Sequence, residues 1–154
     1  MSNIEAIYQK KEHRQHIYDL PDTYIGSAVQ TTFQDAWVIE NESVIQKDVK
    51  YVPGLYKIFD EVLTNASDHK VRSSMQQDIR HVKNIKVHVT DDYVSVENDG
   101  EGIDVEIHPK EKVYVPEMIF GQLLTSTNYK KDDQKTWGGK NGYGAKLANI
   151  FSTE

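Results

Sequence analysis

An amphipathic helix over residues 53–70 is the feature that most constrains how this chain can fold. Pro53 suits the first helical position, where a missing N–H breaks no hydrogen bond. Apolar side chains then recur at helical spacing and form one broad stripe: Leu55, Ile58, Phe59, Val62, Leu63 and Ala66. We expect this stripe to cover a neighbouring layer of structure.

Strands are expected on both sides of this helix in the sequence. Residues 33–51 alternate apolar and polar positions and predict a hairpin that turns near Asn41–Glu42. Residues 85–90 and 93–97 predict a second pair, and a further helix is expected over 116–124. We therefore expect an α/β (α+β) fold, a two-layer sandwich with helices on one face of a mixed sheet.

The composition narrows the class of protein. The 154 residues are 38% hydrophobic and 27% charged, which is typical of one globular domain. No apolar run approaches the ~18 residues that a membrane-spanning helix needs, and the lack of cysteine excludes disulfides and thiolate metal sites and fits an intracellular protein. The net charge of −6 argues against a general nucleic-acid binder, because counterion release requires a positive surface.

Polar residues lie along one margin of the helical stripe. Glu61 and Asn65 are four residues apart, so their side chains reach the same place. A carboxylate there can polarise an attacking water, and an amide oxygen is a hard ligand that suits Mg²⁺. Taken alone, the pair is more often two solvated residues of a surface helix.

A glycine-containing turn follows the second strand pair. Gly100 and Gly102 allow the chain to turn sharply and to approach a flat ligand closely. Asn98, at the end of the strand, could hydrogen-bond a purine. The alternative is a tight turn with ordinary Asn/Asp/Gly chemistry.

A second glycine-rich segment, GGKNGYGAKL, spans residues 138–147 and leads into a helix. Exposed backbone N–H groups at such a helix start can hold a phosphate. No Gly-Lys-Ser/Thr ends the segment, so it is not a P-loop. The alternative is a flexible connector. Ser126, Thr127 and Asn128 offer hydroxyls and an amide before it, although a helix cap and loop would explain them equally well.

This order of motifs resembles the ATPase superfamily of gyrase, heat-shock chaperones, histidine kinases and mismatch-repair proteins. Nearly the whole chain further resembles the N-terminal ATPase domain of eukaryotic-type (type IIA) DNA topoisomerase II. The stretches that carry this resemblance are YQKKEH, PDTYIGS, VPGLYKIFDEVLTNASD, ENDGEGI, YVPEMIFGQLLTSTNY and GGKNGYGAKLANIFSTE.

The resemblance implies a role for each matching position. Glu61 would be the general base, Asn65 would hold Mg²⁺, and Asn98 would read the adenine in a pocket shaped by Gly100 and Gly102. Ribose and phosphate contacts would come from Ser126, Thr127 and Asn128, and the lid around the phosphates from Gly139, Lys140, Asn141, Gly142, Tyr143, Gly144, Ala145 and Lys146. Tyr8 would belong to an arm that reaches the nucleotide of a second subunit.

The resemblance also implies the organisation and the function. Residues 1–30 would form an N-terminal arm or strap, and residues 31–154 an ATP-binding domain of the Bergerat type, truncated at its C-terminal end. ATP, with Mg²⁺, would drive homodimerisation of the full-length protein and close a clamp for ATP-dependent DNA strand passage, in the nucleus of a cellular eukaryote or in the host cytoplasm or virion of a virus, with no membrane partner.

Other functions remain open at this level. The main alternative is a non-hydrolysing, nucleotide-dependent dimerisation module of the same superfamily. A chaperone or kinase member is disfavoured by PDTYIGS and EMIFGQLLTSTNY, and a direct DNA-binding fragment by the acidic balance.

Five positions depart from the family pattern and indicate a divergent member: Leu20, His69, Glu101, Asp104 and Lys140. The family has an asparagine at the position of His69, so the sequence does not decide whether this residue contacts a phosphate or a metal. Lys140 keeps the charge of the family's arginine but loses its bidentate fork.

Overall fold

The structure is a computed structural model, and it describes residues 10–123 and 143–152. The chain packs as two compact units, residues 1–55 and residues 56–154, which are described separately below. The domain boundary that we expected after residue 30 stays a prediction. Among the described residues, no helix is long and apolar enough to cross a bilayer.

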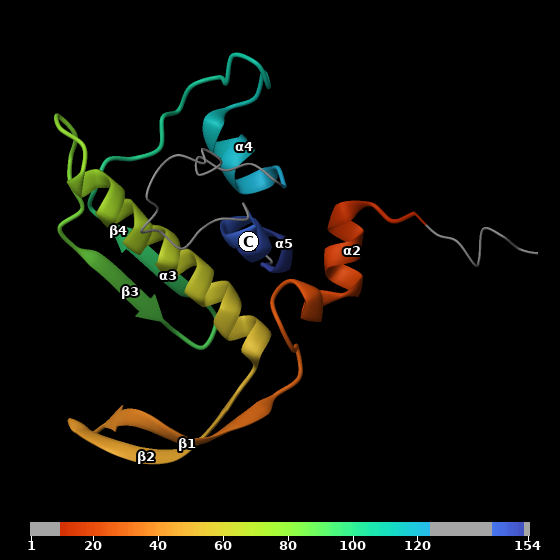
Figure 1. Ribbon diagram of the computed structural model, residues 1–154, viewed down its shortest axis with the longest axis vertical. Coiled ribbons are helices and arrows are strands. Elements are labelled where there is room, and N and C mark those ends of the chain that lie inside the picture. Colours follow the sequence, from red (N-terminus) through yellow and green to blue (C-terminus); the bar gives the residue numbers. More distant parts are fainter. Residues whose placement is uncertain (1–9, 124–142, 153–154) are drawn as a thin grey trace, which may run out of the picture. The chain divides into compact units, whose positions relative to one another are not determined.

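The N-terminal unit contains a short helix and a long hairpin (Figure 1). Pro21 starts a single 3-10 turn because its fixed φ suits a first helical position. The hairpin turns at Asn41 and Glu42, whose φ angles of 50° and 62° give the two-residue turn that matches the twist of paired strands. The turn predicted from the sequence is therefore confirmed. The elements are α2 (His13–Asp19), η1 (Pro21–Thr23), β1 (Thr31–Glu40) and β2 (Ser43–Tyr51).

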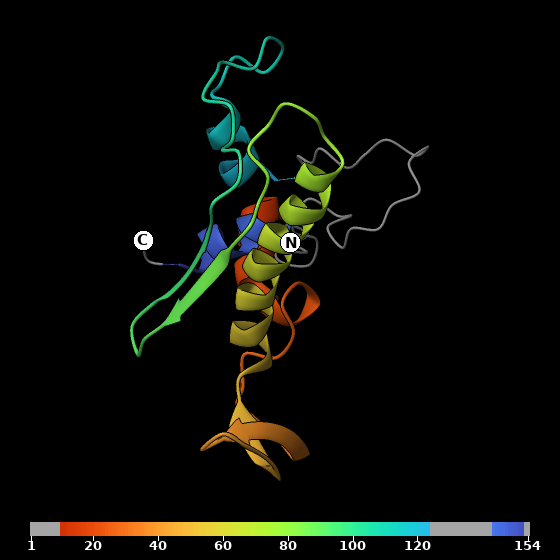
Figure 2. The same cartoon turned by 90° about the vertical axis from the view of Figure 1, so that its left-hand side faces the viewer.

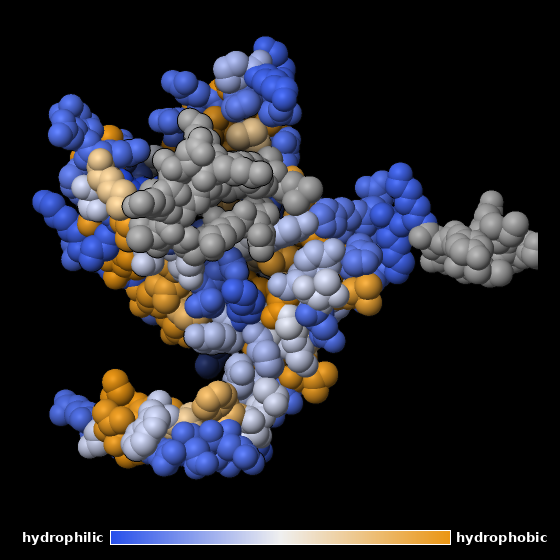
Figure 3. Space-filling view, in the orientation of Figure 1, coloured by the Kyte–Doolittle hydropathy of each residue, from blue (hydrophilic) through white to orange (hydrophobic). Residues whose placement is uncertain are grey.

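The β1–β2 hairpin exposes much of its apolar surface. The two strands pair antiparallel, with a register shift between Phe33 and Ala36 where Asp35 adopts a φ of 54°. Trp37 is 72% exposed and Ile39 is 81% exposed. Figure 3 shows apolar side chains over this hairpin, at the lower end of the view.

The C-terminal unit is arranged around the long helix α3 (Pro53–Ser74), of which Tyr56 onward belongs to this unit. The helix confirms the segment predicted over 53–70 and continues four residues further, ending with the fully buried Ser73 and then Ser74. The remaining elements are β3 (Ile85–Val89), β4 (Val94–Asn98), α4 (Val115–Gly121) and α5 (Gly144–Phe151).

The observed strands confirm the α+β class and differ from the expected sheet in one respect. The residues that the structure describes form two separate antiparallel pairs, β1–β2 and β3–β4. Each pair is joined by a tight turn, which allows antiparallel pairing only. These residues therefore do not form the mixed sheet that we expected.

The end of α3 is fixed to the chain that leads into β3 (Figures 1 and 2). Ser73 is 1% exposed; its Oγ donates to the carbonyl of Lys70 at 3.0 Å and accepts from the N–H of Val82 at 3.2 Å. A Cβ built on Gly100 would overlap the buried side chain of Val82 and would lie 3.1 Å from Cε1 of His69. The last turns of α3, Val82 and the glycine turn after β4 therefore pack as one cluster.

Ser73 provides a test of this cluster. We expect Ser73→Ala to lower the free energy of unfolding by about 1–3 kcal/mol, because the buried N–H of Val82 loses its hydrogen-bond acceptor. Ser74→Ala is the matched control: its hydroxyl is exposed and donates to the carbonyl of Val71 within the helix, so a change within about 0.5 kcal/mol is expected. Equal losses in the two variants, measured by chemical unfolding, would contradict this view of the cluster.

Candidate nucleotide site

Glu61 lies on α3 and forms an ion pair with Lys57, one helical turn before it. Its Oε1 is 2.6 Å from Nζ of Lys57, and its side chain is 23% exposed. Lys57 Nζ is also 3.6 Å from Oδ2 of Asp60. The hydrogen bond to Glu61 raises the pKa of Lys57, which keeps the ammonium charged. Glu61 is therefore a partly covered carboxylate held by a cation at one of its two oxygens.

The other oxygen of Glu61 faces the start of α5. A Cβ built on Gly144 would overlap Oε2 of Glu61 and would lie 3.3 Å from its Cδ. Only a residue without a side chain allows the backbone to come this close. The structure thus brings together two residues that the sequence analysis placed in one site, Glu61 and Gly144.

Helix α5 is held in place by its own packing. Leu147 and Ile150 are buried, and Nδ2 of Asn149 donates to the carbonyl of Phe120 at the end of α4 at 3.1 Å. Lys146 is buried as well, and burial lowers its pKa. Tyr143 precedes the helix as its N-cap residue and Ala145 follows Gly144, both half-buried.

The two candidate asparagines occupy different places. Asn65 is exposed on α3, one turn after Glu61. Asn98 is half-buried at the end of β4, where its Oδ1 accepts from the N–H of Gly100 at 3.2 Å. Gly102 follows, and no atom of the described residues lies within 4 Å of a Cβ built on it. The structure therefore brings Glu61 together with Gly144 and packs Gly100 against His69, further along α3.

Hydrogen bonds from residues 80–84 fix the turn around Gly100. Oδ1 of Asp99 accepts from the backbone N–H groups of Lys83 and Asn84, both at 2.8 Å, and Oδ2 accepts from Nδ2 of Asn84 at 2.8 Å. These bonds, those of Asn84 above all, hold the pKa of Asp99 well below its usual range. Nε and Nη2 of Arg80 donate to the carbonyl of Gly100 at 3.1 and 2.8 Å.

The remaining candidates lie outside the described residues. They are Tyr8, Ser126, Thr127, Asn128, Gly139, Lys140, Asn141 and Gly142. Their roles, and those of the described candidates, stay predictions. Among the described residues no group of three or more histidine or carboxylate side chains could hold a metal ion.

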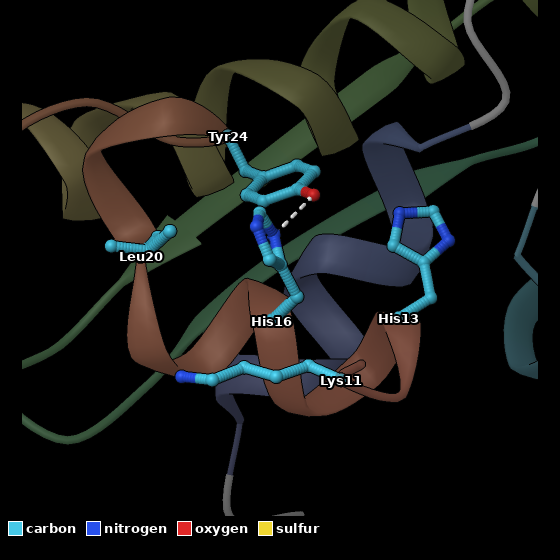
Figure 4. Close-up of a pocket in the computed structure, with 5 residues that line it drawn as sticks. All are labelled: Lys11, His13, His16, Leu20 and Tyr24. Carbon is cyan, nitrogen blue, oxygen red and sulfur yellow. Dashed lines mark hydrogen bonds between the residues drawn. The ribbon is translucent and has the colours of Figure 1, made fainter. Parts of the chain in front are cut away.

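A pocket that the sequence analysis did not single out lies in the N-terminal unit (Figure 4). It has a volume of about 440 Å³ and is lined by Lys11, His13, His16, Leu20 and Tyr24. Nδ1 of His16 and the hydroxyl of Tyr24 form a hydrogen bond of 2.9 Å, with the two rings nearly perpendicular. Two histidines three residues apart before a tyrosine-containing turn are the sequence signal that could have indicated it.

The sequence of residues 51–154 matches the family described as histidine kinase-, DNA gyrase B- and HSP90-like ATPases. This match spans the helix with Glu61, the turn with Asn98 and the glycine-rich segment before α5. The chain belongs to this ATPase family.

Individual relatives within the ATPase family are similar over nearly the whole chain. DNA topoisomerase 2 of Pisum sativum is 54% identical over 151 residues, and that of Saccharomyces cerevisiae is 53% identical over 149 residues. These alignments cover 98% and 96% of this chain but 10% of each relative. The crystal structure of the ATPase region of Saccharomyces cerevisiae topoisomerase II superposes with a TM-score of 0.85 at 49% identity, covering 97% of this chain and 39% of that one.

Three residues near the candidate site were not predicted to act there. Lys57 was visible in the sequence as a lysine four residues before Glu61, which is a helical ion-pair spacing. Arg80 and Asp99 had no such local signal. Their partners lie 20 and 15 residues away in the sequence, so only the folded chain identifies them.

The bonds of Asp99 predict a pH-dependent stability. Asp99→Ala should lower the stability of the folded chain at neutral pH, because two backbone N–H groups lose their acceptor. The folded-state pKa lies below the ordinary value of 3.8, so the ionised form stabilises the fold fully above pH 3.8 and loses this effect as the pH falls further. Unfolding curves of the original and variant chains should therefore converge in acid.

Asp104→Ala is the control for this measurement, because Asp104 is an exposed acid in the loop that follows the Asn98 turn. A gap between Asp99→Ala and the original chain that stays constant from pH 7 to pH 2 would contradict the assignment.

Proposed function

We propose that this chain binds and hydrolyses ATP as the N-terminal ATPase portion of a type II DNA topoisomerase. One observation carries the proposal: the Glu61 carboxylate lies against Gly144, the residue at which the glycine-rich segment enters α5. A base and a phosphate-binding helix start are thereby neighbours, as hydrolysis of a phosphoanhydride requires. Membership of an ATPase family supports the same conclusion.

The chemistry assigned to Glu61 is general-base catalysis. The oxygen of a water forms a bond to the γ-phosphorus, and the bond from that phosphorus to its bridging oxygen breaks. ADP leaves with the electron pair, and a carboxylate oxygen of Glu61 takes a proton from the water. The chain contributes positioning and charge stabilisation more than covalent chemistry, as in other phosphoryl transfers.

Asn65 is the residue that would hold Mg²⁺. The exposed amide lies one turn beyond Glu61 on α3 and no carboxylate cluster is found in the described residues, which suits an ion that takes most of its ligands from water and phosphate. When bound, the ion supplies neutralisation of the phosphate charge. The residues present therefore fit Mg²⁺ held together with ATP, and they do not suggest a site that binds the metal alone.

Asn98 is assigned to the adenine. Its Oδ1 already accepts one hydrogen bond from Gly100, and a carbonyl oxygen has a second lone pair for the exocyclic amine of a purine. Its Nδ2 is a donor for a ring nitrogen. The bonds of Asp99 and Arg80 hold the turn in which Asn98 lies.

This chain spans 10% of the length of the curated relatives it matches. The activity of a complete protein that contains it is therefore a further part of the proposal. We infer that ATP dimerises two such domains and closes a clamp around DNA for strand passage. The clamp would take its DNA contacts from outside residues 1–154, since the net charge of −6 disfavours a general DNA-binding surface here.

Glu61→Gln tests the assigned base in the complete protein that carries residues 1–154. We expect ATP hydrolysis to fall about 100-fold or more while ATP binding persists, because an amide cannot accept the proton of the water. Asp60→Asn makes the same chemical change one residue earlier and should leave hydrolysis intact. Phosphate release and ATP-dependent relaxation of supercoiled plasmid are the measurements.

If Glu61→Gln hydrolyses ATP at the original rate, the general-base assignment is wrong. If the unaltered protein binds ATP and dimerises but releases no phosphate, the alternative of a non-hydrolysing dimerisation module replaces it.

Gly144→Ala tests the close approach of α5. The new methyl group would occupy the place of Oε2 of Glu61, so the carboxylate has to turn away from the helix start. We expect kcat for ATP hydrolysis to fall by about 10- to 100-fold, as for other small displacements of a reacting group. Gly121→Ala is the control, since in the described part of the chain no atom lies within 4 Å of a Cβ built there. Unchanged kcat in Gly144→Ala would contradict the geometry.

A further inference from the structure

The two oxygens of the Glu61 carboxylate have different surroundings. Oε1 forms the 2.6 Å ion pair with Lys57, whereas Oε2 faces Gly144 at the start of α5. A carboxylate attached by three rotatable bonds adopts many orientations unless something holds it. Here one oxygen is held from within α3, and the other is thereby turned towards α5.

We propose that Lys57 is a positioning residue for Glu61, which binds Oε1 and so presents Oε2 at the start of α5. This inference rests on the proposed function, because it assigns to Lys57 a part in the hydrolysis that Glu61 performs. Lys57 itself would touch neither ATP nor the attacking water.

Lys57 pairs more closely with one of the two acids within its reach, which supports a positioning role for it. Asp60 and Glu61 are both within reach of Nζ, at 3.6 Å and 2.6 Å, and the shorter contact is made with Glu61. Asp60 is the more exposed acid, with 40% of its side chain accessible against 23% for Glu61. The lysine therefore pairs with the carboxylate that lies against α5.

Helix stability alone gives this pair little reason to form. A lysine four residues before a glutamate is the less favourable order for an ion pair on a helix. Lys57 is also 43% exposed, so solvent screens much of the attraction. What the ion pair does achieve is to fix the orientation of one side chain beside Gly144.

The experiment compares three variants in the complete protein that carries residues 1–154: Lys57→Met, Lys57→Arg and Lys110→Met. Steady-state ATP hydrolysis gives kcat and KM, and binding of a non-hydrolysable ATP analogue gives Kd. Met keeps the length of the lysine stem without its charge, and Arg restores the charge. Lys110 is an exposed lysine, 87% accessible, far from Glu61 in the sequence and without a role in the site.

We expect Lys57→Met to lower kcat about tenfold, with KM and the analogue Kd within about twofold of the original, since positioning acts on the reacting group rather than on binding. Lys57→Arg should recover at least half of the original kcat, and Lys110→Met should match the unaltered protein. In a Glu61→Gln background, adding Lys57→Met should cause no further loss, because the group that it positions is gone.

Two results would overturn the inference. One is an unchanged kcat in Lys57→Met. The other is a parallel loss of kcat, analogue binding and thermal stability that Lys57→Arg does not rescue, which would make Lys57 a structural residue only. Failure of the proposed function is distinguishable, since then Glu61→Gln itself would keep full hydrolysis.

Discussion

The contact between the Glu61 carboxylate and the first residue of α5 is the constraint on which the candidate site depends. It requires a glycine at position 144, because any side chain there would occupy the place of Oε2. It also requires α5 to be held in place by its own packing. This packing comes from the buried Leu147 and Ile150 and from the hydrogen bond between Asn149 and the carbonyl of Phe120 in α4. The glycine at the contact and the buried apolar residues of α5 together place the start of this helix beside the Glu61 carboxylate.

A second cluster fixes the other end of α3. Ser73 holds the N–H of Val82, and Val82 packs under Gly100, so the turn after β4 cannot shift without disturbing the helix. Asp99 and Arg80 then tie that turn to residues 80–84 by hydrogen bonds to the backbone. Helix α3 thus supports both parts of the candidate site: α5 lies against Glu61 in its N-terminal half, and the Asn98 turn packs against His69 in its C-terminal half.

The sequence predicted the elements better than the way in which they pair. Helical spacing of apolar residues located α3, and the alternation around Asn41–Glu42 located the first hairpin and its turn, because both signals are local. The expected mixed sheet depends on which strands become neighbours, and the described strands form two antiparallel pairs. For the site, the spacing of Glu61 and Asn65 was readable from a single helix. The hydrogen bonds by which Arg80 and Asp99 hold the Asn98 turn could not be predicted in this way. They join residues on separate turns, and no periodic pattern in the sequence marks such pairs.

The sequence by itself determined the helices, the hairpins, the glycine positions and the candidate chemistry, since each depends on residue type and short-range spacing. Only the tertiary structure decided that Gly144 lies against Glu61, 83 residues earlier in the chain, and that Val82 packs against Gly100. It also decided that Lys57 binds Oε1 of Glu61 while Oε2 faces α5. The physical reason is that these contacts follow from how buried faces of separate elements pack, and packing is selected by the whole core rather than by any one segment.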